Sequence, residues 1–397
     1  PVFLDQLKKF KALRFMYPMQ TVHSSQGEWA NRPKLTDAVQ GYIPPDWSPG
    51  KGVALEYMIQ LSNTLNADPW FCIPHRATDE YVRNFATMVR DQLKPGLKAY
   101  IEYSNEIWNY GDPDGDDPSW EGTWSAMQGR VLNTDYPPAP GDPGTGLYGS
   151  PVEPRIGDGS GTSYALTYQG VRSVQIFAIF DQVYQAGGLD PRGRIVRVVA
   201  SQIGWNDRQA FILDYPLGDG TRVYQHADAL AVNPYFGFTL TSIADGLANC
   251  DADIATNFEG SQRDRLFTPA RGLMLVAYEA GQSLINQANP TLARDANRDP
   301  GMGTRYTASL DNWKTSRGEL MFLYNSVSAP GTFGEWGLLE FQGQGHAVTS
   351  GVPALQIPAP KYDAVMRWID ANTCWWTGCA RSGPTDLPRL SISTVTV

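Results

Sequence analysis

The stretch from Ala99 to Asn109, AYIEYSNEIWN, joins a short apolar and aromatic run to an abrupt polar end. The first half has the composition of a β-strand. The strand should stop at Asn105 and Glu106, because a buried run does not continue through two strongly polar residues. A carboxylate there, with an amide before it and Trp108 after it, offers a proton donor, a hydroxyl-binding group and a platform for a sugar ring. Glu106 could instead simply cap the following segment.

A second stretch, Leu273 to Gly281, has the same form. Its sequence, LMLVAYEAG, is an apolar run that ends in an aromatic residue and Glu279. Two carboxylates at two strand ends are the minimum set of groups for glycoside hydrolysis. The two stretches together therefore predict that Glu106 and Glu279 form a catalytic pair.

The bulk composition narrows the class of protein. The chain has 397 residues, of which 42% are hydrophobic, enough for a large core. Its net charge is −9, which disfavours nucleic acid and other polyanionic partners and is compatible with a neutral polysaccharide. No apolar run approaches the roughly 20 residues of a membrane span, so no membrane partner is expected.

The cysteines and the first residue bear on the compartment. Cys374 and Cys379 close a small loop that could hold a disulfide, whereas Cys72 is expected to be a buried thiol unless it reaches Cys250. The chain begins at Pro1, and no signal peptide is visible. This start is what a processed or truncated secreted protein would show, so a secreted location is expected.

Predicted strands and helices alternate along the chain, which is typical of a parallel α/β sheet. The predicted strands lie at 13–16, 70–75, from 99, 195–202, 229–235, from 273 and 331–337. The predicted helices lie at 3–10, 53–65, 78–93, 163–185, 309–325 and 361–370.

Seven strands are one short of a (β/α)8 TIM barrel. Because the chain starts inside a predicted helix, the first barrel strand is expected to be cut off, replaced or supplied from elsewhere. The strand that starts at residue 99 is then the fourth, and the one at 331–337 the eighth. The predicted organisation is a catalytic barrel over 1–372 and a C-terminal tail over 373–397 that carries the cysteine loop.

A long segment from 110 to 162 follows the strand that starts at residue 99. It is rich in Gly, Pro and Asp and shows no periodicity, and loops of this length are usually functional or disordered. Residues 112–117, DPDGDD, are similar to a calcium loop. The glycine and the later glutamate are out of register with the EF-hand pattern, so a solvated loop is the competing interpretation.

This pattern resembles the clan of retaining (β/α)8-barrel glycoside hydrolases that includes the cellulase-like family 5. That clan places an Asn-Glu pair at the end of strand four, which matches Asn105 and Glu106, and a glutamate at the end of strand seven, which matches Glu279. The resemblance implies that Glu106 is the acid/base, Glu279 the nucleophile and Asn105 a ligand of the sugar 2-hydroxyl. A retaining mechanism also implies carboxyl groups about 5–5.5 Å apart.

Further positions match the clan in strand order. The strand-two arginine that steadies the nucleophile would be Arg14, and the strand-three histidine would be His75. The strand-six tyrosine that bonds the nucleophile would be Tyr235, and the strand-eight tryptophan platform would be Trp336. One departure is Asn233, which stands where cellulase-like members often have a histidine.

Each of these residues has a simpler interpretation. Arg14 could pair with a buried acid such as Glu102, and His75 could be a satisfied strand-end histidine. The tyrosine and the tryptophan could pack at the rim of the barrel. Glu335 is an alternative nucleophile to Glu279.

The sequence therefore predicts a secreted, monomeric, retaining glycoside hydrolase that needs no cofactor or metal and cleaves internal bonds of a β-linked polysaccharide or oligosaccharide. One alternative is a non-catalytic carbohydrate-binding barrel, which would carry aromatic platforms without two facing carboxylates. Another is a metal-dependent barrel hydrolase. The chain has 4 His, with no His-x-His or His-Glu-x-x-His pattern to support a metal site.

Overall fold

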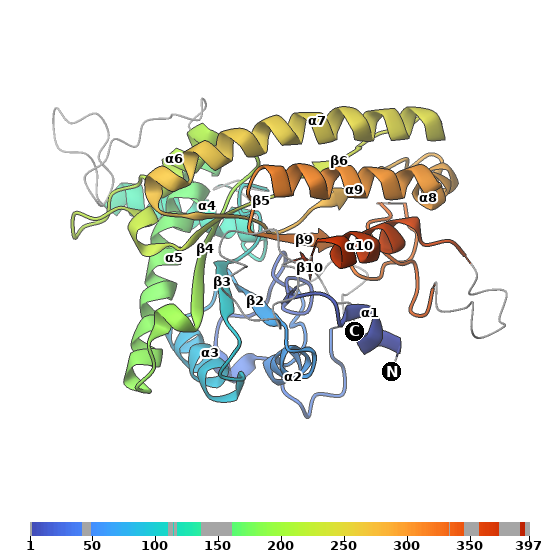
Figure 1. The fold of residues 1–397 in the computed structure, drawn as a ribbon. Coiled ribbons are helices and arrows are strands. Elements are labelled where there is room, and N and C mark those ends of the chain that lie inside the picture. The colour runs from blue at the N-terminus through green and yellow to red at the C-terminus, as the bar shows by residue number, and fades with distance from the viewer. Residues whose placement is uncertain are drawn as a thin grey trace.

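Eight parallel strands form a closed barrel in the computed structural model, which describes residues 2–41, 49–109, 114, 117–135, 161–332, 334–344, 357–372 and 390–393 (Figure 1). In order around the barrel the strands are β1 (Ala12–Arg14), β2 (Asp68–Ile73), β3 (Ala99–Tyr103), β4 (Ile195–Ala200), β5 (Ala229–Val232), β7 (Met274–Ala277), β9 (Leu320–Tyr324) and β10 (Leu390–Ser393). The (β/α)8 class predicted from the sequence is confirmed.

Helices surround the barrel, with α7 and α9 side by side along one edge and α2 and α3 at the opposite edge (Figure 1). The helices are α1 (Val2–Leu7), α2 (Leu55–Leu65), α3 (Asp79–Gln92), α4 (Glu121–Asp135), α5 (Gly161–Ala186), α6 (Asn206–Leu213), α7 (Ile243–Phe267), α8 (Pro290–Arg298), α9 (Pro300–Thr315) and α10 (Pro360–Ala371). Short 3-10 turns lie at Trp29–Asn31, Pro191–Gly193, Val223–His226 and Pro269–Arg271.

The strand β3 shows why an apolar run becomes a barrel strand. All its residues are buried, since it lies between β2 and β4 and is covered by helices on the outside. Tyr100 pairs with Trp70 of β2, and their rings stack with centroids 5.3 Å apart. The helix that precedes β3, α3, is capped by Thr78, whose hydroxyl accepts a hydrogen bond from the backbone N–H of Tyr81.

The place of the missing first strand is taken by β10, from the tail. Leu13 of β1 pairs with Ile392, and Ile392 pairs on its other side with Leu323 of β9. The strand is therefore supplied from elsewhere in the chain, which was one of the three expectations. The boundary predicted at residue 372 does not separate the whole tail from the barrel.

The segment 331–337, which was predicted to be the eighth strand of the barrel, was misplaced. The region predicted as a helix over 309–325 contains the end of α9, at Thr315, and then the strand β9, whose sequence LMFLY is buried throughout. Arg317 adopts a left-handed backbone (φ 57°) between them, which ends the helix. Segment 331–337 follows the strand end and is not a barrel strand.

The segment after the fourth barrel strand contains a helix that was not predicted. Helix α4 lies within 110–162, which was expected to lack regular structure. Its backbone packs directly against α5, because a side chain at Gly129 would collide with the carbonyl oxygen of Tyr164. Gly122 in its first turn lies equally close to the carbonyl oxygen of Asn109. Glycines needed for close packing hid the helix, since they read as loop residues in the sequence.

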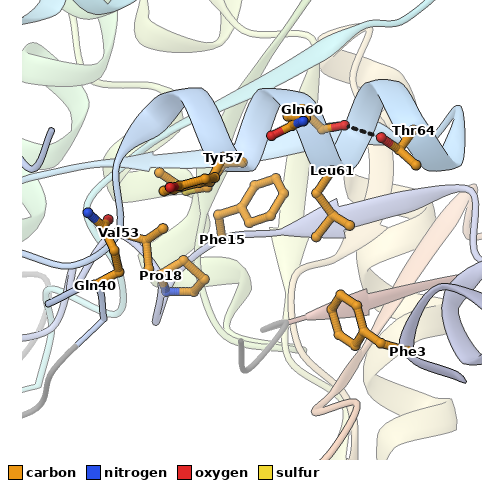
Figure 2. Close-up of a pocket in the computed structure, with 10 residues that line it drawn as sticks. Phe3, Phe15, Pro18, Gln40, Val53, Tyr57, Gln60, Leu61 and Thr64 are labelled. Carbon is orange, nitrogen blue, oxygen red and sulfur yellow. Dashed lines mark hydrogen bonds between the residues drawn. The ribbon is translucent and has the colours of Figure 1, made fainter. Parts of the chain in front are cut away.

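An apolar hollow of about 360 Å³ lies outside the barrel, between β1 and α2 (Figure 2). Phe15 points toward Tyr57 and Leu61 of α2, and Phe3 of α1 lies nearby (Figure 2). Phe15 faces outward because the preceding residue, Arg14, points into the barrel, and successive side chains of a strand alternate. The hollow has no carboxylate among its lining residues, so it offers no acid and base pair.

Cys72 and Cys250 are both buried, free thiols, so the pairing that the sequence left open is not formed. Cys374 and Cys379 lie outside the described residues, and their disulfide stays a prediction. In the described parts of the chain, every helix is too short or too polar to cross a membrane.

Barrel closure by β10 can be tested with proline. Ile392→Pro removes one backbone donor from a strand that is paired on both sides, so the free energy of unfolding should fall by about 1–3 kcal/mol. Ile392→Val, which keeps the N–H, is the control. Thermal unfolding of both variants makes the comparison, and a melting temperature of Ile392→Pro equal to that of the control would contradict the strand assignment.

Candidate active site

The guanidinium of Arg14 lies at the centre of the candidate site. Arg14 is the last residue of β1 and is 0% exposed. Its Nη1 donates to Oε1 of Glu279 at 2.6 Å, and its Nη2 donates to Oδ1 of Asn105 at 2.8 Å. One buried cation therefore ties together the residues that follow β3 and β7.

Glu102 of β3 binds the same cation from inside the barrel. Its Oε2 accepts hydrogen bonds from Nε of Arg14 at 3.2 Å and from Nη2 at 2.8 Å. The same oxygen accepts from the indole N–H of Trp70 at 2.8 Å and lies 3.3 Å from the Cys72 sulfur. Arg14 thus pairs with the buried acid and with Glu279 at once, so the two interpretations of Arg14 are not exclusive.

Glu279 is a buried carboxylate with two different partners. Besides Arg14, it accepts a hydrogen bond from the Tyr235 hydroxyl, which lies 2.8 Å from its Oε2. Burial raises the pKa of Glu279 from its ordinary value of 4.5 to about 7. The charge of Arg14 and the bond from Tyr235 act in the opposite direction, and the charge of Glu106 adds to the rise.

A small parallel sheet beyond the barrel strands holds these partners together. Strands β6 (Tyr235–Phe236) and β8 (Gly281–Gln282) pair, with Tyr235 opposite Gly281. This pairing places the tyrosine hydroxyl beside Glu279, two residues before Gly281. The local pairing therefore fixes the separation of the two elements on which the tyrosine and the carboxylate lie.

Glu106 is held by neutral donors. Its Oε1 accepts from the Tyr278 hydroxyl at 2.5 Å and from Nδ2 of Asn233 at 3.1 Å, and its Oε2 accepts from Nδ2 of Asn109 at 2.9 Å. The backbone is left-handed at Ser104 (φ 56°) and at Glu106 itself (φ 40°). Non-glycine residues in this region carry a conformational cost and gather at functional sites.

Aromatic rings surround the approach to Glu279. Tyr324, the last residue of β9, lies against Tyr17, Tyr235 and Trp336, with ring centroids 6.0, 6.3 and 5.7 Å apart. The indole N–H of Trp336 donates to the Ser283 hydroxyl at 3.2 Å. Trp336 therefore lies near the site, although the strand end at this place is Tyr324.

Trp108 and His75 are placed differently from the other expected site residues. Trp108 is buried, and its ring centroid lies 6.4 Å from that of Tyr278, so it packs behind the donor to Glu106. His75 is also buried, and this burial lowers its pKa to about 3. The charge of Arg76 acts in the same direction. The imidazole is neutral at neutral pH, and neither Glu106 nor Glu279 is among its contacts in the described part of the chain.

The candidate calcium loop is only partly described. Asp114 pairs with Arg130, and Asp117 accepts hydrogen bonds from Ser119 and lies 3.4 Å from Nε2 of His23. The rest of 112–117 lies outside the described residues. Among the residues that are described, no group of three or more His, Cys, Asp and Glu side chains is arranged to hold a metal.

Sequence reasoning did not identify Tyr278, Asn109 or Tyr324 as site residues. Tyr278 precedes Glu279 directly, and side-chain alternation along an extended segment would send the two residues in different directions. Asn109 lies three residues after Glu106, which is the spacing at which a turn brings two side chains together. Tyr324 was hidden by the misplaced eighth strand.

No family model and no curated protein matches the sequence of this chain. Solved structures with a similar fold do exist. One is a 4-O-α-L-rhamnosyl-β-D-glucuronidase from Fusarium oxysporum 12S, with a TM-score of 0.47 and 11% identity over 91% of this chain and 69% of that chain.

Two others are described as family 5 enzymes. The xyloglucanase from Paenibacillus pabuli has a TM-score of 0.38 and 11% identity, over 88% of this chain and 99% of that chain. A Bacteroidetes-affiliated cellulase has a TM-score of 0.34 and 12% identity, over 85% of this chain and 78% of that chain. At these identities the similarity concerns the fold, and the function has to be argued from the site.

The raised pKa of Glu279 makes stability depend on pH. Between pH 4.5 and about 7 the folded state holds a proton on Glu279 that the unfolded state has released. This carboxyl therefore makes the free energy of unfolding fall as pH rises through that window and leaves it level above the window. The free energy of unfolding of the wild type minus that of Glu279→Gln should fall by about 2–3 kcal/mol over the window. Urea denaturation at a series of pH values measures this difference, and a difference independent of pH would contradict the assigned environment.

Proposed function

We propose that this chain is a retaining glycoside hydrolase that cleaves a β-linked polysaccharide. The observation that carries the proposal is the contrast between two interacting carboxylates at the ends of β3 and β7. Glu279 is paired with a buried cation, whereas the hydrogen bonds that Glu106 accepts from described residues all come from neutral donors. Two carboxyl groups with such different surroundings can take different protonation roles.

The surroundings support Glu279 as the nucleophile. Arg14 and Tyr235 both favour its ionised form and oppose the burial that raises its pKa to about 7, so Glu279 is ionised above that pH, as a carboxylate that attacks the anomeric carbon has to be. Glu106, whose hydrogen-bond donors in the described part of the chain are all neutral, would protonate the departing glycosidic oxygen. Glu106 would then take a proton from the water that releases the sugar from Glu279. The expected separation of the two carboxyl groups is about 5–5.5 Å.

Asn105 is placed to bind a sugar hydroxyl. Its Oδ1 accepts from Arg14, which orients the amide and leaves Nδ2 to donate elsewhere. A contact with the 2-hydroxyl strengthens in the transition state of glycosidases. The aromatic cluster that includes Tyr324 and Trp336 would contact the sugar rings.

Other features of the proposal rest on the sequence. Internal cleavage of a polymer fits the aromatic content and the long segment between β3 and α5. The proposed enzyme is secreted and monomeric, has a disulfide between Cys374 and Cys379, and works without a metal or a cofactor. Product analysis on β-glucans, xylans, mannans and galactans would identify the sugar and the linkage.

A non-catalytic carbohydrate-binding barrel is the main competing function. Such a protein has no use for two interacting carboxylates, one of them raised in pKa by burial, so the site favours an enzyme. A reducing-sugar assay separates the two functions. Activity that survives a chelator would argue against a metal-dependent hydrolase.

Substitution of each carboxylate tests the proposal. Glu106→Gln and Glu279→Gln should each lower turnover of the polysaccharide by about two to four orders of magnitude or more, because one removes the proton donor and the other the nucleophile. Circular dichroism and thermal unfolding should show that both variants are folded.

Glu335→Gln is the matched control, since Glu335 is also a buried glutamate whose pKa is raised to about 7 by burial. Its backbone carbonyl accepts hydrogen bonds from Gln282 and Lys361, and among the described residues its carboxylate has no hydrogen-bond partner. Turnover should stay close to that of the wild type. Normal turnover by either Glu106→Gln or Glu279→Gln would remove the proposal.

A further inference from the structure

We propose that Tyr278 is a positioning residue for Glu106 and that, together with Asn233, it confines the transferable proton of Glu106 to Oε2. The inference rests on the proposed function. Tyr278 was not expected at the site, and its hydroxyl makes a 2.5 Å hydrogen bond with Oε1 of Glu106. The roles proposed for Glu279, Arg14 and Tyr235 do not involve the buried hydroxyl of Tyr278, and the inference gives this hydroxyl a function.

The argument starts from the number of lone pairs on Oε1. A carboxyl oxygen accepts through two lone pairs. On Oε1 of Glu106 both are used, one by the Tyr278 hydroxyl and one by Nδ2 of Asn233. A proton on Oε1 would displace one of these donors, whereas a proton on Oε2 displaces neither.

The orientation of Asn233 supports this assignment. Its Oδ1 accepts a hydrogen bond from the backbone N–H of Ile203 at 3.3 Å. The amide group therefore has to present Nδ2, and not its oxygen, to Glu106. Asn233 can donate to Oε1 but cannot accept a proton from it.

Oε2 has room for a proton. Among the residues that the structure describes, it accepts one hydrogen bond, from Nδ2 of Asn109, and this leaves one lone pair. Asn109 is exposed at the surface, so its side chain can adjust when the proton is present. The buried oxygen is thus held by two donors, and the oxygen beside the exposed amide carries the proton.

Tyr278 is held firmly enough to do this. It is 0% exposed, its ring lies 5.0 Å from the Arg14 guanidinium, and its backbone N–H donates to the Val232 carbonyl at 3.0 Å. Since Val232 precedes Asn233, a single backbone bond aligns the two donors to Oε1. Burial also raises the pKa of the phenol, which stays protonated and remains a donor throughout the working pH range.

The proton balance follows the double displacement. In the first step the proton leaves Oε2 of Glu106 for the glycosidic oxygen, the bond from that oxygen to the anomeric carbon breaks, and Glu279 bonds to the carbon. In the second step water gives a proton back to Oε2, its oxygen bonds to the carbon, and Glu279 is released. Tyr278 keeps its own proton in both steps and stabilises the ionised form of Glu106 between them.

The experiment uses Tyr278→Phe on paired aryl β-glycosides that share one sugar and differ in the leaving group, phenol against 2,4-dinitrophenol. The sugar part of these glycosides is chosen first, as the glucose-, xylose-, mannose- or galactose-configured disaccharide whose aryl glycoside the wild type cleaves fastest. With phenol, which needs protonation, kcat/KM should fall by about 10- to 100-fold. With 2,4-dinitrophenol, which departs without a proton, it should stay close to the wild-type value.

The pH profile provides a second readout. Loss of a donor to the ionised carboxylate favours the protonated form, so the basic limb of kcat/KM should move up by about one pH unit. Tyr235→Phe removes a hydroxyl from the other carboxylate and should move the acidic limb upward instead. Tyr184→Phe is the folding control, because Tyr184 lies on α5 and its buried hydroxyl has no hydrogen-bond partner within the part of the chain that the structure describes.

The possible outcomes are distinguishable. Equal losses on the two glycosides, or an unmoved basic limb, would overturn the inference and leave the proposed function in place. If the wild type cleaves none of the glycosides, or if Glu106→Gln cleaves the phenyl glycoside normally, the proposed function fails and the inference fails with it.

Discussion

The ion pairs of one buried guanidinium hold this site together. Arg14 is fully buried and bonds to Glu102, Glu279 and Asn105 at the same time. Removing a partner from a buried pair leaves an uncompensated charge, which typically costs about 3–5 kcal/mol. Loss of the Arg14 side chain would therefore leave two buried carboxylates, Glu102 and Glu279, without the positive charge that pairs with them.

The position of Arg14 depends in turn on barrel closure. β1 has only 3 residues, and Arg14 pairs with Trp70 of β2 on one side and with Ser393 of β10 on the other. So short a strand has few hydrogen bonds of its own, and both neighbours are needed to fix its register. The tail strand thus lies directly beside the residue that organises the site, which links the C-terminal region to the carboxylates.

The two carboxylates differ because strand alternation distributes their partners. Glu279 faces Arg14 and Tyr235, whereas its neighbour Tyr278 faces Glu106. Adjacent residues of one strand end therefore serve opposite members of the pair. A shift of this strand end would therefore disturb both carboxylates together.

Much of this arrangement could be predicted from the sequence. Buried parallel strands read as continuous apolar runs, so strands such as β3 and β7 and the polar residues at their ends were recognisable. Arg14, Asn105, Glu106, Tyr235 and Glu279 are brought together as expected, and Asn233 joins them through Glu106.

What could not be predicted depends on long-range pairing. The sequence of β10 contains no signal for its neighbours, since β1 lies more than 370 residues away in the chain. β9 was merged with the preceding helix because short apolar runs fit both periodicities, and Tyr324 was lost with it. The bond between Tyr278 and Glu106 spans 172 residues and is set by barrel geometry alone.

The most direct test of the central claim is the anomeric configuration of the first product. Proton NMR during cleavage of a β-linked oligosaccharide distinguishes the two anomers before mutarotation mixes them. Double displacement through Glu279 predicts that the β-anomer appears first and the α-anomer only later. Initial release of the α-anomer would mean that water attacks the sugar directly, and it would contradict the role of Glu279 as a nucleophile.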